Sequence, residues 1–444
     1  MKLTSHPRFM FIQHPMVWLC ATIGLITGII SNARGTDLIG IFIIMIGLFA
    51  ITVILYNYPD SRLRNILFVA FFLRVGLALF QAFIAPLPDS TADAVTFERI
   101  GWEAAQAWLN GGVAPKLSGA YLYSAWIGIF YYLFGRVELV PQFMNVILGV
   151  LTVFLIYKLT IEITDSKRSA QIAGLIAALF PTLNLYSAIT MRENLIVVST
   201  VFSVYCFARW LNRGTLKAML GAAVALLVAS SLHGGMIVIG AVYALFFCFY
   251  DPRRKRWVLF SAWLLVGVAL IAAVFGLFGS LFINKLPSDV FLLLSPEYLD
   301  SHTTAYARDR AAYLVGLTPN SIGDLIVQTP IRMAYFLFTP FPWMVSSIID
   351  IMGLVDAFIY IILVFYSIKG LYWLKEKNKV MFIAMILVLI IAIVTFAWGT
   401  SNYGTAIRHR QKFAWLLISM ASLGIVQSNW WRWLLPVKRT SKIN

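Results

Sequence analysis

The chain of 444 residues is 60% hydrophobic and only 12% charged, and its mean hydropathy of +0.83 excludes a soluble globular fold. The net charge of +16 could suggest a nucleic-acid partner, but the basic residues stand in short clusters between apolar runs. That distribution is the positive-inside pattern of a membrane protein, so we expect an integral membrane protein that binds the lipid bilayer and no nucleic acid.

The apolar runs predict an all-α, polytopic fold. A membrane-spanning helix needs roughly 20 apolar residues, and the sequence contains about 12 such runs. The predicted spans lie near residues 15–31, 37–55, 66–85, 139–160, 170–190, 193–210, 217–233, 235–250, 257–283, 346–368, 379–398 and 412–428. The predicted regions are two additional N-terminal helices at 1–65, a transmembrane core at 66–283 with an outer-face loop at 86–138, an outer-face loop region at 284–345, and C-terminal helices at 346–444.

The basic clusters assign the two sides of the membrane. Lys167 with Arg168, the run Asp251–Arg256 and the run Lys375–Lys379 fall on one face, which we predict to be cytoplasmic together with both termini. This assignment requires that Tyr121–Phe134 does not cross the membrane. A helix over this segment reaches only about 21 Å, short of the ~30 Å hydrocarbon core, so we expect an interfacial helix there.

A polar stretch, Pro86–Gly112, follows the third predicted span and has the pattern of an amphipathic helix that lies at a membrane surface. It contains Asp89, Asp93 and Glu98 in a chain with few acidic residues. Two interpretations of these carboxylates stay open. In one, Asp93 or Ser90 caps the helix. In the other, a carboxylate is held at the outer surface for chemistry, where it takes a proton from an attacking hydroxyl.

The other predicted outer-face segments supply cations that suit a phosphate group. Arginine binds phosphate with two parallel hydrogen bonds, so an arginine-rich outer face suits a lipid-phosphate substrate. The candidate substrate-binding residues are Glu98, Arg192, Glu193, Arg310, Arg332, Tyr403, Arg408 and Arg410. The alternatives are an ion pair between Arg192 and Glu193, solvated loop charges, and contacts of the last two arginines with lipid headgroups.

Three stretches carry a resemblance to a known family. They are the acidic segment DSTADAVTFERIGWEAA, the segment Tyr121–Leu195, which contains LFG, AALFP and an outer-face RE, and the late segment GTAIRHR. In this order they resemble the C-type glycosyltransferase (GT-C) superfamily, above all its protein O-mannosyltransferase and lipid A aminoarabinose transferase branch. The resemblance implies a GT-C-like fold and a catalytic base in the first outer loop, by position Asp93, with Asp89 second. This chain departs from the family by separating these two acids and by carrying Gln142 and Asn145 at the start of the fourth span, where many members have an arginine.

The resemblance implies an enzyme that transfers a sugar, with inversion, to a glycan, lipid or protein acceptor on the periplasmic or extracellular face of a bacterial inner (plasma) membrane. The implied donor is a polyprenyl-phosphate- or pyrophosphate-linked sugar. The sequence identifies no certain cofactor and shows no ligand spacing that requires a metal, while a divalent cation near Asp93 stays open. A rival reading is a polysaccharide polymerase or ligase that uses undecaprenyl-pyrophosphate-linked repeats and depends on Arg408 and Arg410. A transporter of lipid-linked sugars is disfavoured because we expect no buried charge pair near the middle of a span and see no internal repeat.

Overall fold

The computed structural model describes residues 38–259, 265, 267–268, 310–319 and 321–428. The predicted span at 15–31, most of the span at 257–283 and residues 284–309 of the predicted outer-face region lie outside the described residues. The chain forms two compact units. The first unit is Met1–Leu151 with Leu183–Asn194, and the second is Thr152–Thr182 with Leu195–Asn444.

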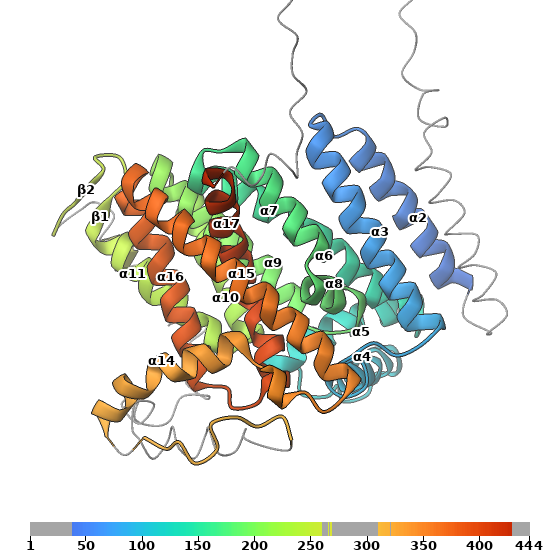
Figure 1. The fold of residues 1–444 in the computed structure, drawn as a ribbon. Helices are drawn as coiled ribbons and strands as arrows, with labels where there is room; N and C mark the ends of the chain where they lie inside the picture. The colour runs from blue at the N-terminus through green and yellow to red at the C-terminus, as the bar shows by residue number, and fades with distance from the viewer. Residues whose placement is uncertain (1–37, 260–264, 266, 269–309, 320, 429–444) are drawn as a thin grey trace, which may run out of the picture. The chain divides into compact units, whose positions relative to one another are not determined.

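The first unit holds the N-terminal helices and the predicted outer-face loop (Figure 1). Its helices are α2 (Leu38–Tyr56), α3 (Ser61–Phe83), α4 (Asp93–Asn110), η1 (Gly119–Tyr121), α5 (Leu122–Phe134), the start of α6 (Leu139–Thr164) and the end of α8 (Pro181–Ala188). Asp60 begins α3, because its carboxylate accepts hydrogen bonds from two backbone amides of the first turn. The short helix predicted at Tyr121–Phe134 is confirmed as α5.

Helices α4 and α5 pack tightly because glycine faces the partner helix on each side. A side chain at Gly101 would collide with Ile127 of α5, and a Cβ at Gly128 would lie 3.0 Å from the backbone carbonyl of Gly101. The ring of Phe97 contacts that of Tyr123 edge-on at 5.6 Å between centroids. The close packing of α5 therefore fixes the position of α4, the helix that follows the turn at Asp89.

The second unit contains the remaining helices and one small hairpin. Its elements are the rest of α6, α7 (Lys167–Leu179), α9 (Glu193–Arg213), α10 (Leu216–Leu232), η2 (Gly234–Val238), α11 (Ile239–Phe249), β1 (Tyr250–Asp251), β2 (Arg256–Trp257), α14 (Ile322–Phe338), η4 (Pro342–Met344), α15 (Ile348–Lys377), α16 (Lys379–Trp398) and α17 (Tyr403–Gln427). The short strands β1 and β2 pair in antiparallel fashion, and the turn between them is formed by the basic run that starts at Asp251.

Helices α15 and α17 run side by side along their length (Figure 1). Contacts near their starts join Asp350 to Tyr403, and contacts near their ends join Gly370 to Gly424, so the two helices are parallel. At the glycine pair the two backbones approach so closely that a Cβ on Gly370 would overlap a carbonyl of α17. Small residues at such a crossing are typical of helix pairs in membranes.

Among the described residues, five helices are long and apolar enough to cross a membrane, or six if α7 and α8 form one broken span. The five are Ser61–Phe83, Leu139–Thr164, Glu193–Arg213, Asp350–Lys377 and Lys379–Trp398. The chain is therefore an all-α, integral membrane protein with several spans. The span predicted at 170–190 is instead a helix pair bent by 53°, because Pro181 starts a new helix and lacks the amide that would continue the old one.

Two segments that we predicted to be loops contain helices. The predicted outer-face region at 284–345 includes α14, whose N-cap Ser321 accepts a hydrogen bond from the amide of Asp324. The segment between the spans predicted at 379–398 and 412–428, which we expected to be an outer-face loop, is mostly helical, because Asn402 caps α17 at Tyr403 through the amides of the first turn. The pattern of polar residues concealed this early start.

Candidate active site

Asp89 lies in a tight turn directly before α4. Its backbone has a φ of 61°, a left-handed conformation that aspartate tolerates better than most residues. One carboxylate oxygen of Asp89 accepts a hydrogen bond from the hydroxyl of Tyr186 in α8. The carboxylate is thus held at the surface by a partner that lies 97 residues further along the chain.

Asp93 is the first residue of α4 and its side chain is exposed. The interpretation in which Asp93 or Ser90 is the N-cap of this helix is wrong, because Ala92 occupies that position and makes no side-chain capping hydrogen bond. The left-handed turn at Asp89 precedes the helix, so that Ala92 and not an acidic residue stands at the N-cap position. A carboxylate in the first turn still gains from the positive end of the helix dipole, typically by ~0.3–1 kcal/mol.

The segment Ile189–Asn194 is held in place by Asn145 of α6. The side-chain amide of Asn145 donates to the carbonyls of Ile189 and Met191 at 2.7 and 3.0 Å, and to the hydroxyl of Tyr123 at 2.9 Å. The side chain of Asn194 in turn donates to the backbone carbonyl of Asn145. This buried amide therefore fixes the polar turn that contains Arg192.

Arg192 lies against the same face of α4 that carries Asp93. Its guanidinium stands over the ring of Phe97, 5.5 Å from the centroid, and its Nε lies 4.0 Å from the carboxylate of Glu193. Phe97 follows Asp93 by four residues, so the two side chains share one face of the helix. The structure thus brings Asp89, Asp93, Arg192 and Glu193 into one region of the first unit. We call this set the loop cluster.

Glu98 points to a different partner. Its carboxylate receives two hydrogen bonds from Arg136, at 3.0 and 2.9 Å, and these bonds raise the pKa of Arg136. Burial raises the pKa of the neighbouring Glu138, and the negative charge of Glu98 adds to that shift. Glu98 therefore ties the end of α5 to α4, and the role predicted for it in substrate binding stays a prediction.

In the second unit, Arg310 and Tyr403 converge on Asp350 at the start of α15. Arg310 donates to both carboxylate oxygens of Asp350 at 2.5 and 3.2 Å, and the hydroxyl of Tyr403 donates at 3.0 Å. The hydrogen bond to Asp350 raises the pKa of Arg310. This geometry links the segment before α14 to the starts of α15 and α17.

Arg332 and Arg410 are buried, whereas Arg408 is half-buried. Arg332 donates to the carbonyl of Leu317 and stacks over Trp398 at 4.1 Å. Arg410 is fully buried, lies 3.0 Å from the carboxylate of Asp356 and donates to the carbonyl of Leu337 at 2.7 Å. These are the contacts of residues that hold helices together; binding of substrate by Arg332, Arg408 or Arg410 stays a prediction.

The Arg410–Asp356 pair corrects one of our arguments against a transporter. We expected no buried charge pair in the spans, but Asp356 lies near the middle of the span predicted at 346–368, and its carboxylate is 2% exposed. Arg74 is likewise buried within α3, where it donates to Ser187 at 3.3 Å. Both pairs join helix to helix, so buried charge does not by itself favour transport in this fold.

Sequence reasoning missed the residues that position the loop cluster. Tyr186 donates to Asp89, whereas Asn145 and Asn194 hold the turn that contains Arg192, and each of the three lies within or next to a predicted span. The available signal was a polar side chain in an apolar run, which usually faces another helix. Among the described residues, no three His, Cys, Asp or Glu side chains gather as a metal site would require.

Comparison with known proteins gives a partial match in sequence. Residues 118–277 match the profile of the family described as dolichyl-phosphate-mannose-protein mannosyltransferase. This match confirms, for this part of the chain, the resemblance to the protein O-mannosyltransferase branch. A search of curated proteins gave no significant match.

Two solved structures from one archaeon are similar to this one. The crystal structure of the Archaeoglobus fulgidus oligosaccharyltransferase in the apo form has a TM-score of 0.49 and 16% identity. The archaeal oligosaccharyltransferase AglB from the same organism, in complex with an inhibitory peptide and a dolichol-phosphate, has a TM-score of 0.48 and 13% identity. Each alignment covers 85% of this chain and 52% of the other, so the chain spans about half the length of these structures.

Proposed function

We propose that this protein is a membrane glycosyltransferase that transfers a sugar from a polyprenyl-phosphate-linked donor to an acceptor hydroxyl. The observation that carries the proposal is the mannosyltransferase profile over residues 118–277, which begins after α4, the helix that starts at Asp93, and includes Arg192. A carboxylate at the start of α4 and an arginine that packs over Phe97 of the same helix supply the groups that this reaction needs. We place the active site on the outer face of the membrane and both termini in the cytoplasm, because the basic clusters follow the positive-inside pattern.

In the proposed reaction, Asp93 takes the proton of the acceptor hydroxyl. The acceptor oxygen forms a bond to the anomeric carbon of the donor, while the bond from that carbon to the lipid phosphate breaks. The phosphate leaves with the electron pair, and the configuration at the anomeric carbon inverts. Arg192 steadies the charge that develops on the departing phosphate, because a guanidinium offers paired N–H donors to its oxygens.

Two features support Asp93 over Asp89 as the base. Asp93 is exposed at the start of α4 and does not serve as its cap. Asp89 already accepts the hydroxyl of Tyr186, which suits a residue that positions the turn. A divalent cation beside Asp93 stays a prediction, which chelation with EDTA followed by an activity assay would test.

The test compares Asp93→Asn and Asp89→Asn in purified protein with a radiolabelled polyprenyl-phosphate sugar. We expect Asp93→Asn to lose about 10²–10⁴-fold in turnover, the usual contribution of a general base. Folded protein should change little, because the first-turn carboxylate contributes only ~0.3–1 kcal/mol to the helix. Glu103→Gln is the matched control, since this exposed carboxylate on α4 pairs only with Arg99 among the described residues.

The outcomes separate the candidates. Normal turnover in Asp93→Asn with a dead Asp89→Asn variant would make Asp89 the base. Normal turnover in both variants would remove the loop cluster from catalysis and move the polymerase or ligase reading forward. We expect Arg192→Ala to weaken donor binding, and unchanged donor affinity would return Arg192 to a structural role with Glu193.

A further inference from the structure

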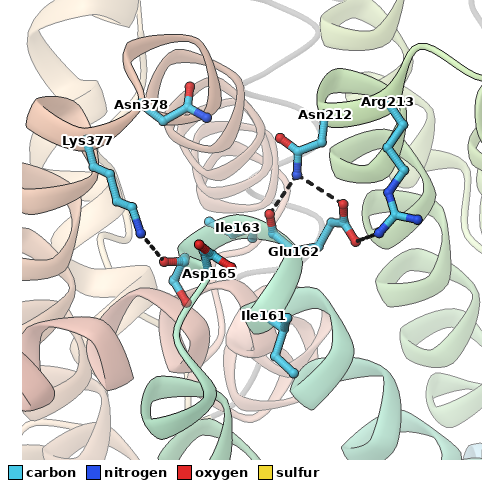
Figure 2. A pocket seen from close by; sticks show the side chains of 9 residues that line it. Ile161, Glu162, Ile163, Asp165, Asn212, Arg213, Lys377 and Asn378 are labelled. Carbon is cyan, nitrogen blue, oxygen red and sulfur yellow. Dashed lines mark hydrogen bonds and ion pairs between the residues drawn. The ribbon is translucent and has the colours of Figure 1, made fainter.

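A pocket of about 370 Å³ lies in the second unit, where three helices end together. Helix α6 ends at Thr164, α9 at Arg213 and α15 at Lys377, and all three terminal residues line the pocket (Figure 2). The volume falls within the range of about 300–1,000 Å³ that is usual for small-molecule sites. The basic clusters place this end of the helices at the predicted cytoplasmic face, at the height of the lipid headgroups.

Charged side chains of both signs line the pocket. Figure 2 shows Lys377 and Arg213 on opposite sides, with Glu162 and Asp165 between them. Glu162 lies 3.6 Å from Arg213 and accepts a hydrogen bond from the amide of Asn212 at 3.0 Å. These two opposite charges therefore compensate each other within the protein.

The other two charges are not compensated in this way. The ammonium of Lys377 donates to the neutral carbonyl of Thr164 at 3.0 Å and lies over the ring of Trp373. The carboxylate of Asp165 is exposed and makes no ion pair within the part of the chain that the structure describes. A ligand that carries both a phosphate and a cation would satisfy Lys377 and Asp165 at the same time.

The helix ends decide which cation fits. The last carbonyls of each helix have no partner within it, and the helix dipole adds partial negative charge there. Three such ends meet at this pocket. The carbonyls of Glu162 and Thr164 already accept hydrogen bonds from Asn212 and Lys377, so a cation with N–H donors would use the remaining carbonyls of these ends. A primary ammonium can donate to them, whereas a quaternary ammonium has no N–H to donate.

We propose that this pocket binds the headgroup of a phospholipid with a phosphate and a primary ammonium, as in phosphatidylethanolamine. The phosphate faces Lys377, and the ammonium faces Asp165 and the carbonyls at the helix ends. The proposal is independent of the catalytic assignment, because none of these residues belongs to the loop cluster.

Native mass spectrometry of the detergent-solubilised protein tests the proposal. The protein is titrated with dioleoyl-phosphatidylethanolamine, dioleoyl-phosphatidylcholine or dioleoyl-phosphatidylglycerol. We expect one tightly bound phosphatidylethanolamine and weaker binding of the other two lipids. Equal binding of phosphatidylethanolamine and phosphatidylcholine would overturn the proposal, and soluble phosphoethanolamine binding as tightly as the lipid would overturn its assignment to a lipid.

Variants localise the binding. Asp165→Asn and Lys377→Gln should each weaken phosphatidylethanolamine binding by about tenfold, which corresponds to the loss of one charge-assisted hydrogen bond. Asparagine tolerates the left-handed backbone of residue 165, where φ is 53°, so the fold should be kept. Glu376→Gln and Lys375→Gln are the matched controls. Each removes one negative or one positive charge outside the pocket, and each should bind the lipid like the wild type. Unchanged binding in both pocket variants would overturn the proposal.

Discussion

The buried pair Arg410–Asp356 gives a sharp test of what the charges of α17 do. Replacing Arg410 by Met leaves the carboxylate of Asp356 in an interior where it is only 2% exposed, and also removes the donor to the carbonyl of Leu337. Breaking one side of a buried ion pair usually costs about 3–5 kcal/mol, because the remaining charge is buried without its partner. We expect Arg410→Met to destabilise the protein by that amount.

The double variant separates the lost pair from the buried charge. Replacing both partners, Arg410→Met with Asp356→Leu, removes the uncompensated charge and should recover most of the lost stability. The free energy of unfolding is measured in mixed micelles of increasing SDS content by tryptophan fluorescence. Arg99→Gln is the control, because the exposed Arg99–Glu103 pair should contribute only about 0.3–0.5 kcal/mol.

Two results would contradict this reasoning. If Arg410→Met lowered the free energy of unfolding by less than about 1 kcal/mol, Arg410 would contribute no more than a surface ion pair does. Additive losses in the double variant would mean that the two side chains do not interact. If, in either case, donor binding fell sharply in Arg410→Met, the arginine would return to the phosphate-binding role that the sequence predicted.

Three further variants test other parts of the fold. Gly370→Ala should lower the thermal stability in detergent markedly, because its Cβ would overlap a carbonyl of α17, whereas Gly76→Ala, with open space around it, should not. Tyr186→Phe removes the hydrogen bond that holds the carboxylate of Asp89, and with it the turn before Asp93, so turnover should fall more than stability does. A fall in turnover no larger than the loss of folded protein would contradict this. The raised pKa of Glu138 means that wild-type stability falls as pH rises above the ordinary value of 4.5, so Glu138→Gln should flatten the melting temperature between acid and neutral pH.

Apolar runs with clear ends could be located from the sequence. The span predicted at 379–398 coincides with α16, and the one at 37–55 differs from α2 by one residue at each end. The ends of these helices can be recognised from the neighbouring sequence, because charged or turn-forming residues flank each apolar run. The start of α17 and the whole of α14 could not be located this way, because both helices carry polar residues whose partners lie far away in the chain.

The same distinction applies to the candidate site. The sequence identified Asp89, Asp93 and Arg192, because charge next to an apolar run is visible without a structure. It could not identify Tyr186 or Asn145 as their supports, because a single hydroxyl or amide in an apolar run does not reveal which distant residue it contacts. The hydrogen bonds of both residues depend on tertiary packing.

The segment Arg408–Lys412 shows why charge alone is a weak guide to loops in this chain. Arg410, Gln411 and Lys412 are buried, and the ammonium of Lys412 lies 5.3 Å from the centroid of Phe396. A helix can carry such residues where a neighbouring helix supplies the opposite charge, as α15 does with Asp356. Arg410 therefore reports on the contact between α15 and α17, and Lys412 on the contact between α16 and α17. Both should be left out when basic residues are counted to assign the sides of the membrane.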